Sequence, residues 1–426
     1  MIDIKILRDS PEKVKRNLEI RNLTAFPFEE LLSLDRERRE TITRNQKLRE
    51  ERNRISVEVS RAKREGKTAD DLISEMRTTS EEITRNDKKI SELSLRFETL
   101  LSAVPNFVDP EVPIGIDETS NKEVKRWGET KPGKLDHIDI SDRLKLIDIE
   151  RAAKTSGARF YFLKGDLARL NFGLISYALD FLRQRNFILI QPPYMLKREA
   201  IGGAVILGDF EEVIYKIEDE DLYLIGTSEH AIASMHMQEI FDPGTLPIRY
   251  GGVSPCFRKE AGAHGRDTKG IFRVHQFEKV EQFVFCEPSE SEGEHRLLLE
   301  NAQNFVESLG IPYRVMLLCS GDMGKVASKT FDIEGWIPSQ NKYRELISCS
   351  NCTDFQARSL GLKYRPRSHE ESQFVHTLNS TLVATERTLV AILENYCDPD
   401  SVSVKIPHVL QKYMGGQTEI KSAPVA

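Results

Sequence analysis

The sequence predicts an α+β protein that begins with a long helical hairpin, and two observations support this. Residues 29–104 contain no proline, one glycine and one aromatic residue, and their apolar side chains recur at intervals of seven. Residues 133–416 instead alternate short strand-like runs with helix-like segments, which is typical of a mixed α+β domain. A chain of 426 residues is long enough for two or three such domains.

The composition favours a protein without membrane spans. Apolar residues make up 39% of the chain and charged residues 30%, and the net charge is −6. No apolar run approaches the roughly 18 residues that a membrane helix needs, and charged residues follow Met1 too soon for a secretory signal. Six cysteines indicate reduced thiols, not a disulfide framework. We therefore expect a cytoplasmic protein with no membrane partner.

The heptad pattern predicts two antiparallel helices. The second half of the stretch has one seam at Met76, Ile83, Ile90, Phe97 and Val104, a second at Leu72, Leu93 and Leu100, and polar breaks at Thr79 and Asn86. The first half repeats more loosely, at Leu34, Thr41, Leu48, Ile55 and Ala62. Residues 64–70, around Gly66, resemble a turn. A short turn between two long helices predicts an antiparallel coiled coil, about 50 Å long at about 1.5 Å per residue.

The charge of this hairpin is uneven. Residues 36–67 contain twelve lysines and arginines against six acidic residues, a local excess of six positive charges. A solvated helical face with ion pairs would explain this, and so would a basic strip that follows a phosphate backbone. Composition alone does not choose between the two.

Composition also suggests the domain boundaries. We expect an N-terminal domain over residues 1–106 and a linker over 107–132, which is rich in proline, glycine and charge. A second domain is expected over 133–416, followed by a flexible tail over 417–426.

A polar β-hairpin is the strongest chemical signal in the second domain. The strand-like runs that end at Phe257 and begin near Ile271 are joined by a polar loop that contains glycines. Alternate residues share one face of a strand, so Arg258 lies beside Glu260, and Phe277 beside Glu281. Arginine, aromatic and carboxylate groups on one face suit a ligand with phosphates and a flat ring. A solvent-facing sheet with cross-strand ion pairs is the alternative.

Five motifs then identify a resemblance. The run FRKEAGAHGRDTKGIFRVHQFEKVEQF resembles motif 2 of class II aminoacyl-tRNA synthetases in its seryl form. Residues 179–193, closed by a proline, are similar to motif 1, and residues 378–395 are similar to motif 3. Residues 226–229 resemble the family's serine loop, and residues 343–352 resemble the strand that meets ATP and its metal. The hairpin lies where this family has its tRNA-binding arm.

The resemblance implies an antiparallel sheet that binds ATP. It assigns the α-phosphate to Arg258, the adenine end to Glu260, stacking on adenine to Phe277 and the γ-phosphate to Arg387. Glu345 and Ser348 would hold Mg²⁺ through oxygen ligands, which suit a hard cation. The complete ATP set is Arg258, Glu260, Val274, Phe277, Glu345, Leu346, Ile347, Ser348 and Arg387.

The resemblance also implies a serine site. Its residues are Thr227, Glu229, Arg258, Glu281, Asn379 and Thr381. The serine hydroxyl would meet Glu281 and Thr381, and the ammonium group would meet Thr227 and Glu229. Glu281 and Thr227 also have purely structural explanations. Glu281 could pair with Lys279 or Arg273, and Thr227 could cap a helix. The residues that we expect to act in catalysis are Arg258, Glu281, Glu345 and Arg387.

The implied partners are serine, ATP with Mg²⁺, tRNA(Ser), also tRNA(Sec) where that RNA exists, and a second copy of the chain. Three departures from the bacterial pattern bear on the ATP contacts: Ile347, Glu386 and the pair Ser380–Thr381. Cys349 and Cys352 have the spacing of half a zinc site, but no second pair matches it. Competing interpretations are a ligase for a carrier protein, a synthetase for a neighbouring amino acid, and a non-catalytic RNA-binding scaffold.

Overall fold

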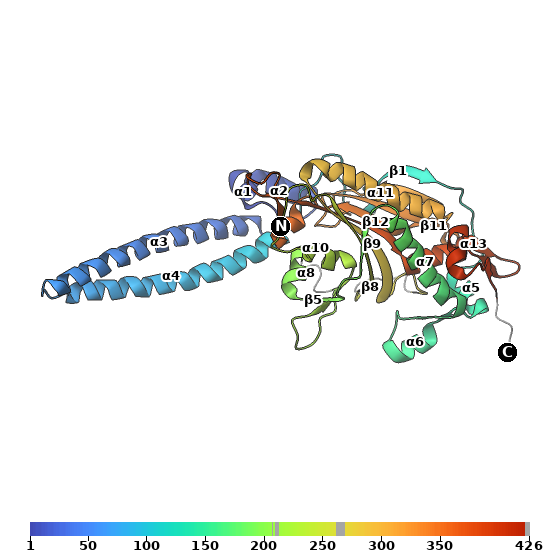
Figure 1. Cartoon of the computed structure of the whole chain (residues 1–426), viewed down its shortest axis with the longest axis horizontal. Coiled ribbons are helices and arrows are strands. Elements are labelled where there is room, and N and C mark those ends of the chain that lie inside the picture. The colour runs from blue at the N-terminus through green and yellow to red at the C-terminus, as the bar shows by residue number, and fades with distance from the viewer. Residues whose placement is uncertain (207, 209–212, 261–268, 422–426) are drawn as a thin grey trace. The chain divides into compact units, whose positions relative to one another are not determined.

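The computed structural model describes residues 1–206, 208, 213–260 and 269–421, and the chain divides into two compact units (Figure 1). Unit 1 comprises residues 1–19 and 23–105, and unit 2 comprises residues 20–22 and the chain from Asn106 onward. Most of the polar loop expected between the two strands of the β-hairpin, residues 261–268, lies outside the described ranges.

Unit 1 confirms the predicted helical hairpin. After α1 (Ile4–Asp9) and α2 (Pro11–Ile20), the long helices α3 (Phe28–Arg64) and α4 (Asp70–Ala103) lie side by side along their length (Figure 1). Gly66 has a φ of 69° in the turn between them, a conformation that glycine adopts without strain. The seam is apolar near both ends and burial follows the heptads, with Leu34, Ile55, Val59, Ile83, Leu93 and Phe97 buried.

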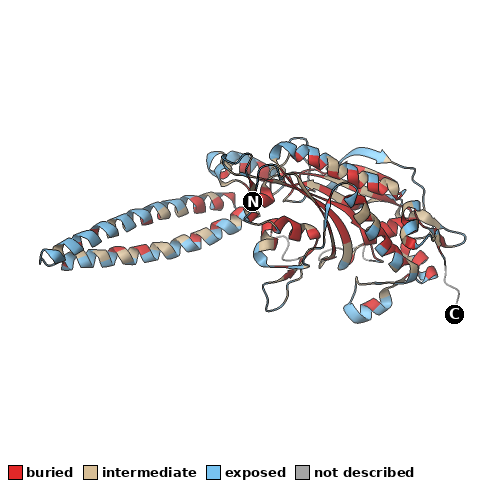
Figure 2. Cartoon of the chain, in the orientation of Figure 1, coloured by how far each residue is buried: buried red, intermediate tan, exposed pale blue. Residues whose placement is uncertain are grey.

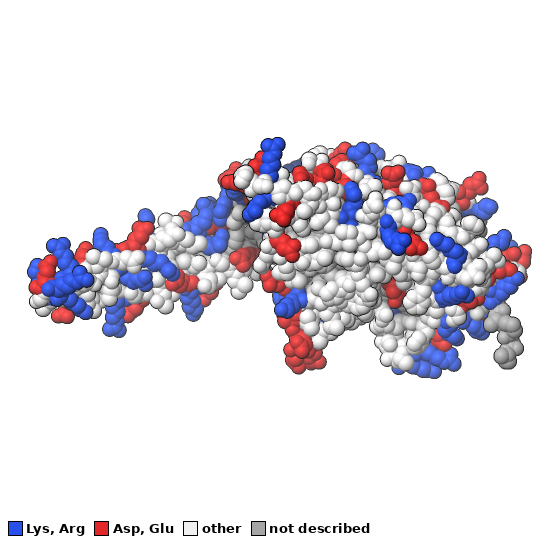
Figure 3. Space-filling view, viewed as in Figure 1, with Lys and Arg blue, Asp and Glu red and all other residues white. Residues whose placement is uncertain are grey.

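The middle of the seam is polar. The Asn45 side chain is buried, and its amide donates to the Asp87 carboxylate at 2.7 Å. Arg49 donates to the same carboxylate at 2.8 Å. Outside the seam the hairpin is exposed, and lysines and arginines alternate with acidic residues over its surface (Figures 2 and 3). The hairpin is therefore held by a narrow seam under a charged, hydrated surface.

Unit 2 is built on a sheet that, in the described part of the chain, has eight strands in the order β1-β10-β11-β12-β15-β9-β8-β4. Neighbouring strands are antiparallel except β4 and β8, which are parallel. This confirms the predicted α+β class and its antiparallel sheet. The strand bounds are β1 (Lys122–Trp127), β4 (Ile188–Ile190), β8 (Ile248–Phe257), β9 (Gln276–Cys286), β10 (Tyr313–Leu317), β11 (Lys329–Ile337), β12 (Lys342–Asn351) and β15 (His376–Ala384).

Helices and small sheets surround this sheet. The helices are α5 (His137–Leu144), α6 (Ile149–Ser156), α7 (Gly165–Arg183), α8 (Arg198–Ala204), α10 (Ser228–Ser234), α11 (Ser291–Ser308), α12 (Phe355–Leu360), α13 (Thr385–Tyr396) and α14 (His408–Gln411). Short strands form the sheets β2 (Ile147–Asp148)/β3 (Phe162–Leu163), β5 (Met195–Leu196)/β6 (Tyr223–Leu224), β7 (Ile240–Phe241)/β13 (Lys363–Tyr364)/β14 (Gln373–Phe374) and β16 (Cys397–Asp398)/β17 (Ser403–Lys405)/β18 (Glu419–Ile420). No helix in the described ranges is long and apolar enough to cross a membrane.

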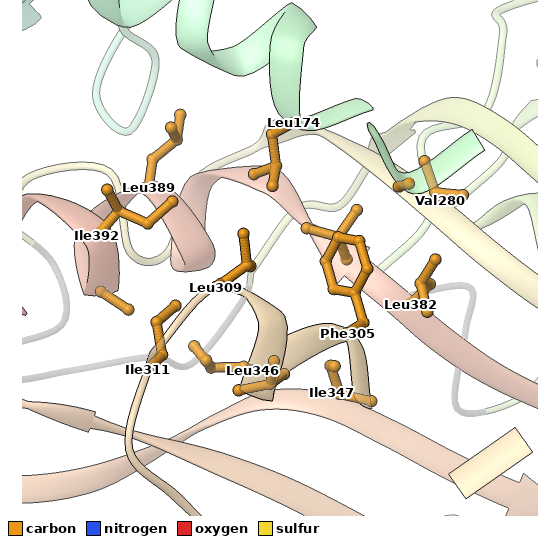
Figure 4. Close-up of a cluster of buried hydrophobic side chains, with 14 of the residues drawn as sticks. Leu174, Val280, Phe305, Leu309, Ile311, Leu346, Ile347, Leu382, Leu389 and Ile392 are labelled. Carbon is orange, nitrogen blue, oxygen red and sulfur yellow. The ribbon is translucent and has the colours of Figure 1, made fainter. Parts of the chain in front are cut away.

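The two faces of the sheet bury different cores. Two consecutive glycines of β8 show this, because a side chain at Gly251 would meet Leu182 of α7, whereas one at Gly252 would meet Ile232 of α10. On β9, Val280 and Val284 belong to the core with α7, α11 and α13 (Figure 4), and Phe283 and Phe285 belong to the core with α8, α10 and α12. The odd-numbered residues of β9 therefore point to the face covered by α10.

Two segments are more ordered than their composition indicated. The strand β1 lies inside the expected linker, 107–132, and its Trp127 ring stacks on Tyr313 at 5.9 Å between centroids. The strand β18 lies inside the expected tail, and its Ile420 is fully buried. The strand β1 pairs with β10, far along the chain, and β18 pairs with β17, which lies outside the expected tail; local composition reveals neither pairing.

Candidate functional site

A cavity of about 450 Å³ lies on the sheet face that also carries α10. It is lined by residues of β9, β12 and β15, by the ends of α8, α10 and α13, and by connecting residues at 205–206, 227, 258, 260, 272–274, 324–327 and 352. Every predicted site residue except Ile347 lines this cavity: Thr227, Glu229, Arg258, Glu260, Val274, Phe277, Glu281, Glu345, Leu346, Ser348, Asn379, Thr381 and Arg387. Ile347 lies instead in the main apolar core, so its side chain does not reach the cavity.

A β-bulge brings the two predicted metal ligands together. Glu345 and Ser348 are three residues apart, a spacing that places side chains on opposite faces of a regular strand. In β12, however, Ile347 pairs with Ile333 and Glu345 pairs with the next residue, Glu334, which leaves Leu346 as the extra residue. The extra residue shifts the alternation of side chains between the two faces by one position. As a result, both Glu345 and Ser348 line the cavity.

The neighbouring strand carries a second bulge, and the sheet opens between the two. In β15, Thr381 pairs with Glu281 and Val383 pairs with Val280, so Leu382 is the extra residue. Pairing between β12 and β15 is restricted to residues 349–351 against residues 378–380. The floor of the cavity is therefore the place where two bulged strands separate.

Arg387 and Glu345 form one end of the cavity. Arg387 is the third residue of α13, and it donates to the Glu345 carboxylate at 3.1 Å and to the Glu345 carbonyl at 3.0 Å. Its guanidinium lies 5.3 Å from the centre of the Phe272 ring. The positive charge of Arg387 holds the pKa of Glu345 below its usual value. This end combines a cation at a helix N-terminus with an ionised carboxylate.

Glu386 poses no electrostatic conflict with the neighbouring Arg387. Its carboxyl group is buried and accepts hydrogen bonds from the hydroxyl groups of Thr385 and Tyr161. Burial, together with the nearby Glu278, raises the pKa of Glu386 well above its usual value. This shift favours the neutral form of the carboxyl group, which lessens the negative charge beside the predicted site for phosphates.

Arg258 and Phe277 lie in contact near the middle of the cavity. The Arg258 guanidinium is 5.2 Å from the centre of the Phe277 ring, and its Nε donates to the carbonyl of Gly226 at 3.2 Å. The same Gly226 donates its backbone N–H to His230 at 3.4 Å. Burial, with Arg258 nearby, lowers the pKa of His230 to about 3, so its ring is a neutral acceptor. The serine loop predicted at 226–229 is thus tied to Arg258.

Glu260 is fixed by two arginines that the sequence interpretation did not place in the site. Its backbone has a φ of 48°, an uncommon conformation for a residue with a side chain. Arg273 donates to its carboxylate at 2.6 Å, and Arg159 donates to its carbonyl at 2.7 Å. Alternation along the strand expected from Ile271 would place Arg273 on the face of Phe277, a signal that could have identified it, although the observed strand β9 begins at Gln276. Arg159 carries no such signal.

The buried carboxylate of Glu281 and the half-buried carboxylate of Glu229 line the other end of the cavity. Glu281 forms an ion pair with Lys279 and accepts a hydrogen bond from the Thr227 hydroxyl at 3.3 Å. Glu229 accepts from the amides of Asn379 at 3.1 Å and Gln356 at 3.0 Å. Burial, with the charge of Glu281, raises the pKa of Glu229 to about 7.

The alternative explanations given above for Thr227 and Glu281 also hold in the structure. Thr227 caps α10 by accepting the backbone N–H of Glu229 at 3.2 Å, and Glu281 pairs with Lys279. Neither contact removes the residue from the cavity wall. Each residue therefore makes a structural contact and still lines the cavity. A bound polar ligand would replace these contacts.

The segments 204–206 and 324–327 are parts of the wall that sequence reasoning missed entirely. Neither lies within one of the five motifs, and both have an unremarkable composition. Cys352 was considered only as a metal ligand, but it lines the cavity and accepts a hydrogen bond from Asn379 at 3.6 Å. Cys349 is buried in the main core.

Comparisons with known proteins agree with the geometry. Residues 1–108 match the model of the seryl-tRNA synthetase N-terminal domain, and residues 214–396 match the class II tRNA synthetase core domain of the G, H, P, S and T enzymes. The serine–tRNA ligase of Nitrosopumilus maritimus is 51% identical over 99% of this chain and 100% of its own length.

Solved structures are similar over the whole chain. The seryl-tRNA synthetase of Pyrococcus horikoshii, crystallised with ATP, has a TM-score of 0.91 and is 44% identical, with 100% of both chains covered. The cytoplasmic serine–tRNA ligase of Naegleria fowleri, crystallised with AMP, has a TM-score of 0.85 and is 38% identical, with 100% of this chain and 99% of its own covered.

Proposed function

This chain belongs to the seryl-tRNA synthetase family, and from that premise we propose that it activates L-serine with ATP and transfers it to tRNA(Ser). The serine carboxylate attacks the α-phosphorus of ATP, pyrophosphate leaves, and seryl-adenylate forms. A terminal ribose hydroxyl of the tRNA then attacks the activated carbonyl, and AMP leaves. The supporting observation is that Arg258, Glu281, Glu345 and Arg387 line one cavity.

The residues around the cavity suit the first step. Phosphoryl transfer depends mainly on positioning and on neutralising charge, which Arg258 and Arg387 would supply at the α- and γ-phosphates. Phe277 offers a ring for adenine, and the half-buried, twice-anchored Glu260 fixes the adenine end. Glu345 and Ser348 present a carboxylate and a hydroxyl to the same space, and they would hold Mg²⁺. When bound, that ion would neutralise phosphate charge.

Two carboxylates would select the amino acid. Glu229, held by two amides, would accept the serine ammonium group, and Glu281 with Thr381 would accept the hydroxyl. Bound alanine would leave the buried acceptor Glu281 without a hydroxyl donor. The cost of that unpaired group discriminates strongly against alanine and in favour of serine. We expect the extra methyl group of threonine to be excluded by the close walls of this end.

The N-terminal domain, residues 1–106, would bind tRNA, and residues 133–416 would carry out catalysis. The excess of positive charge on α3 supports this assignment, as does a shallow groove on that helix lined by Arg36, Arg39, Glu40, Thr43, Arg44 and Lys47. Phosphate contacts of this kind position a nucleic acid without reading its sequence. The same surface would accept tRNA(Sec) where that RNA exists.

We also expect a homodimer in the cytoplasm. The strand β4 ends the eight-stranded sheet, and its Ile188 and Leu189 are 54% and 37% exposed. Phe172 of α7 is 68% exposed. Ile188 and Leu189 belong to residues 179–193, which resemble motif 1, and Phe172 lies earlier in α7. A second copy of the chain would bury these side chains.

Two measurements on the purified protein test the function. Aminoacylation of tRNA with radiolabelled serine should succeed, and ATP–pyrophosphate exchange across a panel of amino acids should favour serine over alanine by roughly a hundredfold or more. Preference for another amino acid would indicate a synthetase of different specificity. Exchange without charging of tRNA would favour a carrier-protein ligase, and neither activity would favour a scaffold.

A further inference from the structure

Two residues of unit 2, Arg21 and Asn106, which stand in the sequence on either side of the helical hairpin, hold one wall of the cavity. This wall is the segment 324–327, and all four of its consecutive carbonyl groups accept hydrogen bonds from Arg21 or Asn106. Arg21 donates to the carbonyls of Gly324 at 3.3 Å and Ala327 at 2.5 Å. Asn106 donates its backbone N–H to Lys325 at 2.8 Å and its side-chain amide to Val326 at 3.0 Å. A hydrogen bond therefore holds each of the four peptide carbonyls of this wall.

Arg21 is an unusual anchor, because its guanidinium is buried among carbonyl groups. The residue is 5% exposed, and its remaining nitrogen, Nε, donates to the carbonyl of Asn106 at 2.9 Å. Burial lowers its pKa to about 10, so it stays charged at neutral pH. A planar guanidinium has donors at fixed angles and can bridge three carbonyls from two segments, whereas a lysine ammonium group cannot reproduce that geometry.

Asn106 extends the contact to the predicted ammonium site. Its side-chain amide also donates to the carbonyl of Cys352 at 2.8 Å and to the hydroxyl of Thr353 at 3.1 Å. The Cys352 thiol accepts from the amide of Asn379, and that amide donates to Glu229 at 3.1 Å. Three residues of this chain of contacts, Cys352, Asn379 and Glu229, line the cavity.

From this arrangement we propose that Arg21 and Asn106 are positioning residues for the amino-acid end of the cavity, an inference that rests on the proposed function. They do not line the cavity themselves. They set the position of the wall 324–327 and, through Cys352 and Asn379, of the Glu229 carboxylate. The hydrogen bonds and ring contacts of Arg387 and of Arg258 described above, at the nucleotide end, involve neither residue.

The expected signature is a change in the KM for one substrate. Replacing Arg21 with Lys, or Asn106 with Ala, should raise the KM for serine about tenfold or more, because small displacements of a binding group have large effects. The KM for ATP should change less than threefold. Asn106→Ala keeps the backbone bond to Lys325 and all three bonds of Arg21, so it tests the side chain with the least disturbance of folding.

Two matched controls separate positioning from general damage. Asn121→Ala removes an asparagine that holds the same β10–β11 connection at its other end, where it donates to Asp322 at 2.7 Å and accepts from the backbone of Cys319 at 2.8 Å. Arg16→Lys changes an exposed arginine that pairs with Glu19 on α2. Both should leave the KM for serine unchanged, and thermal unfolding should show that all four variants are folded.

The experiment is ATP–pyrophosphate exchange with each substrate varied in turn. An equal rise in both KM values for folded Asn106→Ala, no rise in either, or the same serine effect in Asn121→Ala would overturn the inference. If the wild-type protein activates a different amino acid, the proposed specificity fails. The same comparison of KM values, made with that amino acid, still decides whether Arg21 and Asn106 position its site.

Discussion

The helical hairpin and the cavity both contain many charged residues, but the ion pairs of the hairpin are more exposed to solvent than those of the cavity. On the hairpin, Arg44 and Glu82 pair with their side chains 70% and 28% exposed, whereas in the cavity Lys279 and Glu281 pair at 7% and 1%. Exposed pairs contribute about 0–1 kcal/mol, whereas removing one partner of a buried pair costs about 3–5 kcal/mol. The hairpin can therefore exchange its ion pairs freely with solvent or phosphate, but the cavity needs a ligand of matching charge.

The sharpest test of this contrast replaces one arginine in each region. Arg387→Ala or Arg258→Ala should reduce serine activation at least about a thousandfold, because each removes a charge that is poised for the transition state. Binding of tRNA should be nearly unchanged in both variants. Arg44→Ala on the hairpin should leave activation at the wild-type level. Pyrophosphate exchange and filter binding measure these effects, and near-normal activation in both cavity variants would refute the site.

Deleting residues 36–98 and joining the ends with a short glycine–serine link tests whether the hairpin binds tRNA while unit 2 alone forms the adenylate. The deletion removes most of the positive surface and leaves unit 2 intact, so adenylate formation should continue at close to the wild-type rate. Charging of tRNA should fall about a hundredfold or more, because the phosphate contacts that bring the tRNA to the site are lost. Unimpaired charging at low tRNA concentration would show that the hairpin is not the tRNA-binding arm.

A pH series tests the buried carboxylate. Because the pKa of Glu229 is raised to about 7, the group is mostly protonated at pH 6 and mostly ionised at pH 8. The serine ammonium group needs the ionised form, so the KM for serine should fall by several-fold to about tenfold from pH 6 to pH 8. Burial of the ionised group also works against folding, so its contribution to stability declines as pH rises from the unfolded pKa, about 4.3, to about 7.

The control for this series is Glu229→Gln, which should bind serine weakly and without that pH dependence. The KM for ATP serves as an internal reference in the wild-type enzyme. A serine KM that is flat between pH 6 and pH 8, or one that rises with pH, would contradict the assigned role.

The smallest expected effect concerns the seam of the hairpin. Asn45→Leu replaces a buried amide whose Oδ1 has no hydrogen-bond partner, and Arg49 remains to pair with Asp87. The variant should gain about 0.5–1.5 kcal/mol of stability in unit 1, because a polar seam residue fixes register at a cost in stability. Thermal unfolding of wild type and variant measures this gain, and a loss of stability would show that the Asn45–Asp87 bond outweighs it. Serine activation should not change.

The two regions also differ in how much of them the sequence could predict. The seam of the hairpin repeats every seven residues, so local spacing was sufficient to find Leu34, Ile83 and Phe97. The cavity residues were found by resemblance to a family, because strand alternation alone would have separated Glu345 from Ser348. The wall at 324–327 and its anchor Arg21 were not found, because about 300 residues of sequence separate the partners and neither segment has a pattern.

The extra residue at Leu346 makes the bulge, as well as side-chain identity, a requirement of this site. Substituting Leu346 by another apolar residue leaves the count of residues between Glu345 and Ser348 unchanged. Straightening β12 with all its residues retained would turn one of the two toward the apolar core, whereas deleting Leu346 would leave them two residues apart and still on one face. Relatives that keep both residues should therefore have either the bulge or one residue fewer between these two positions.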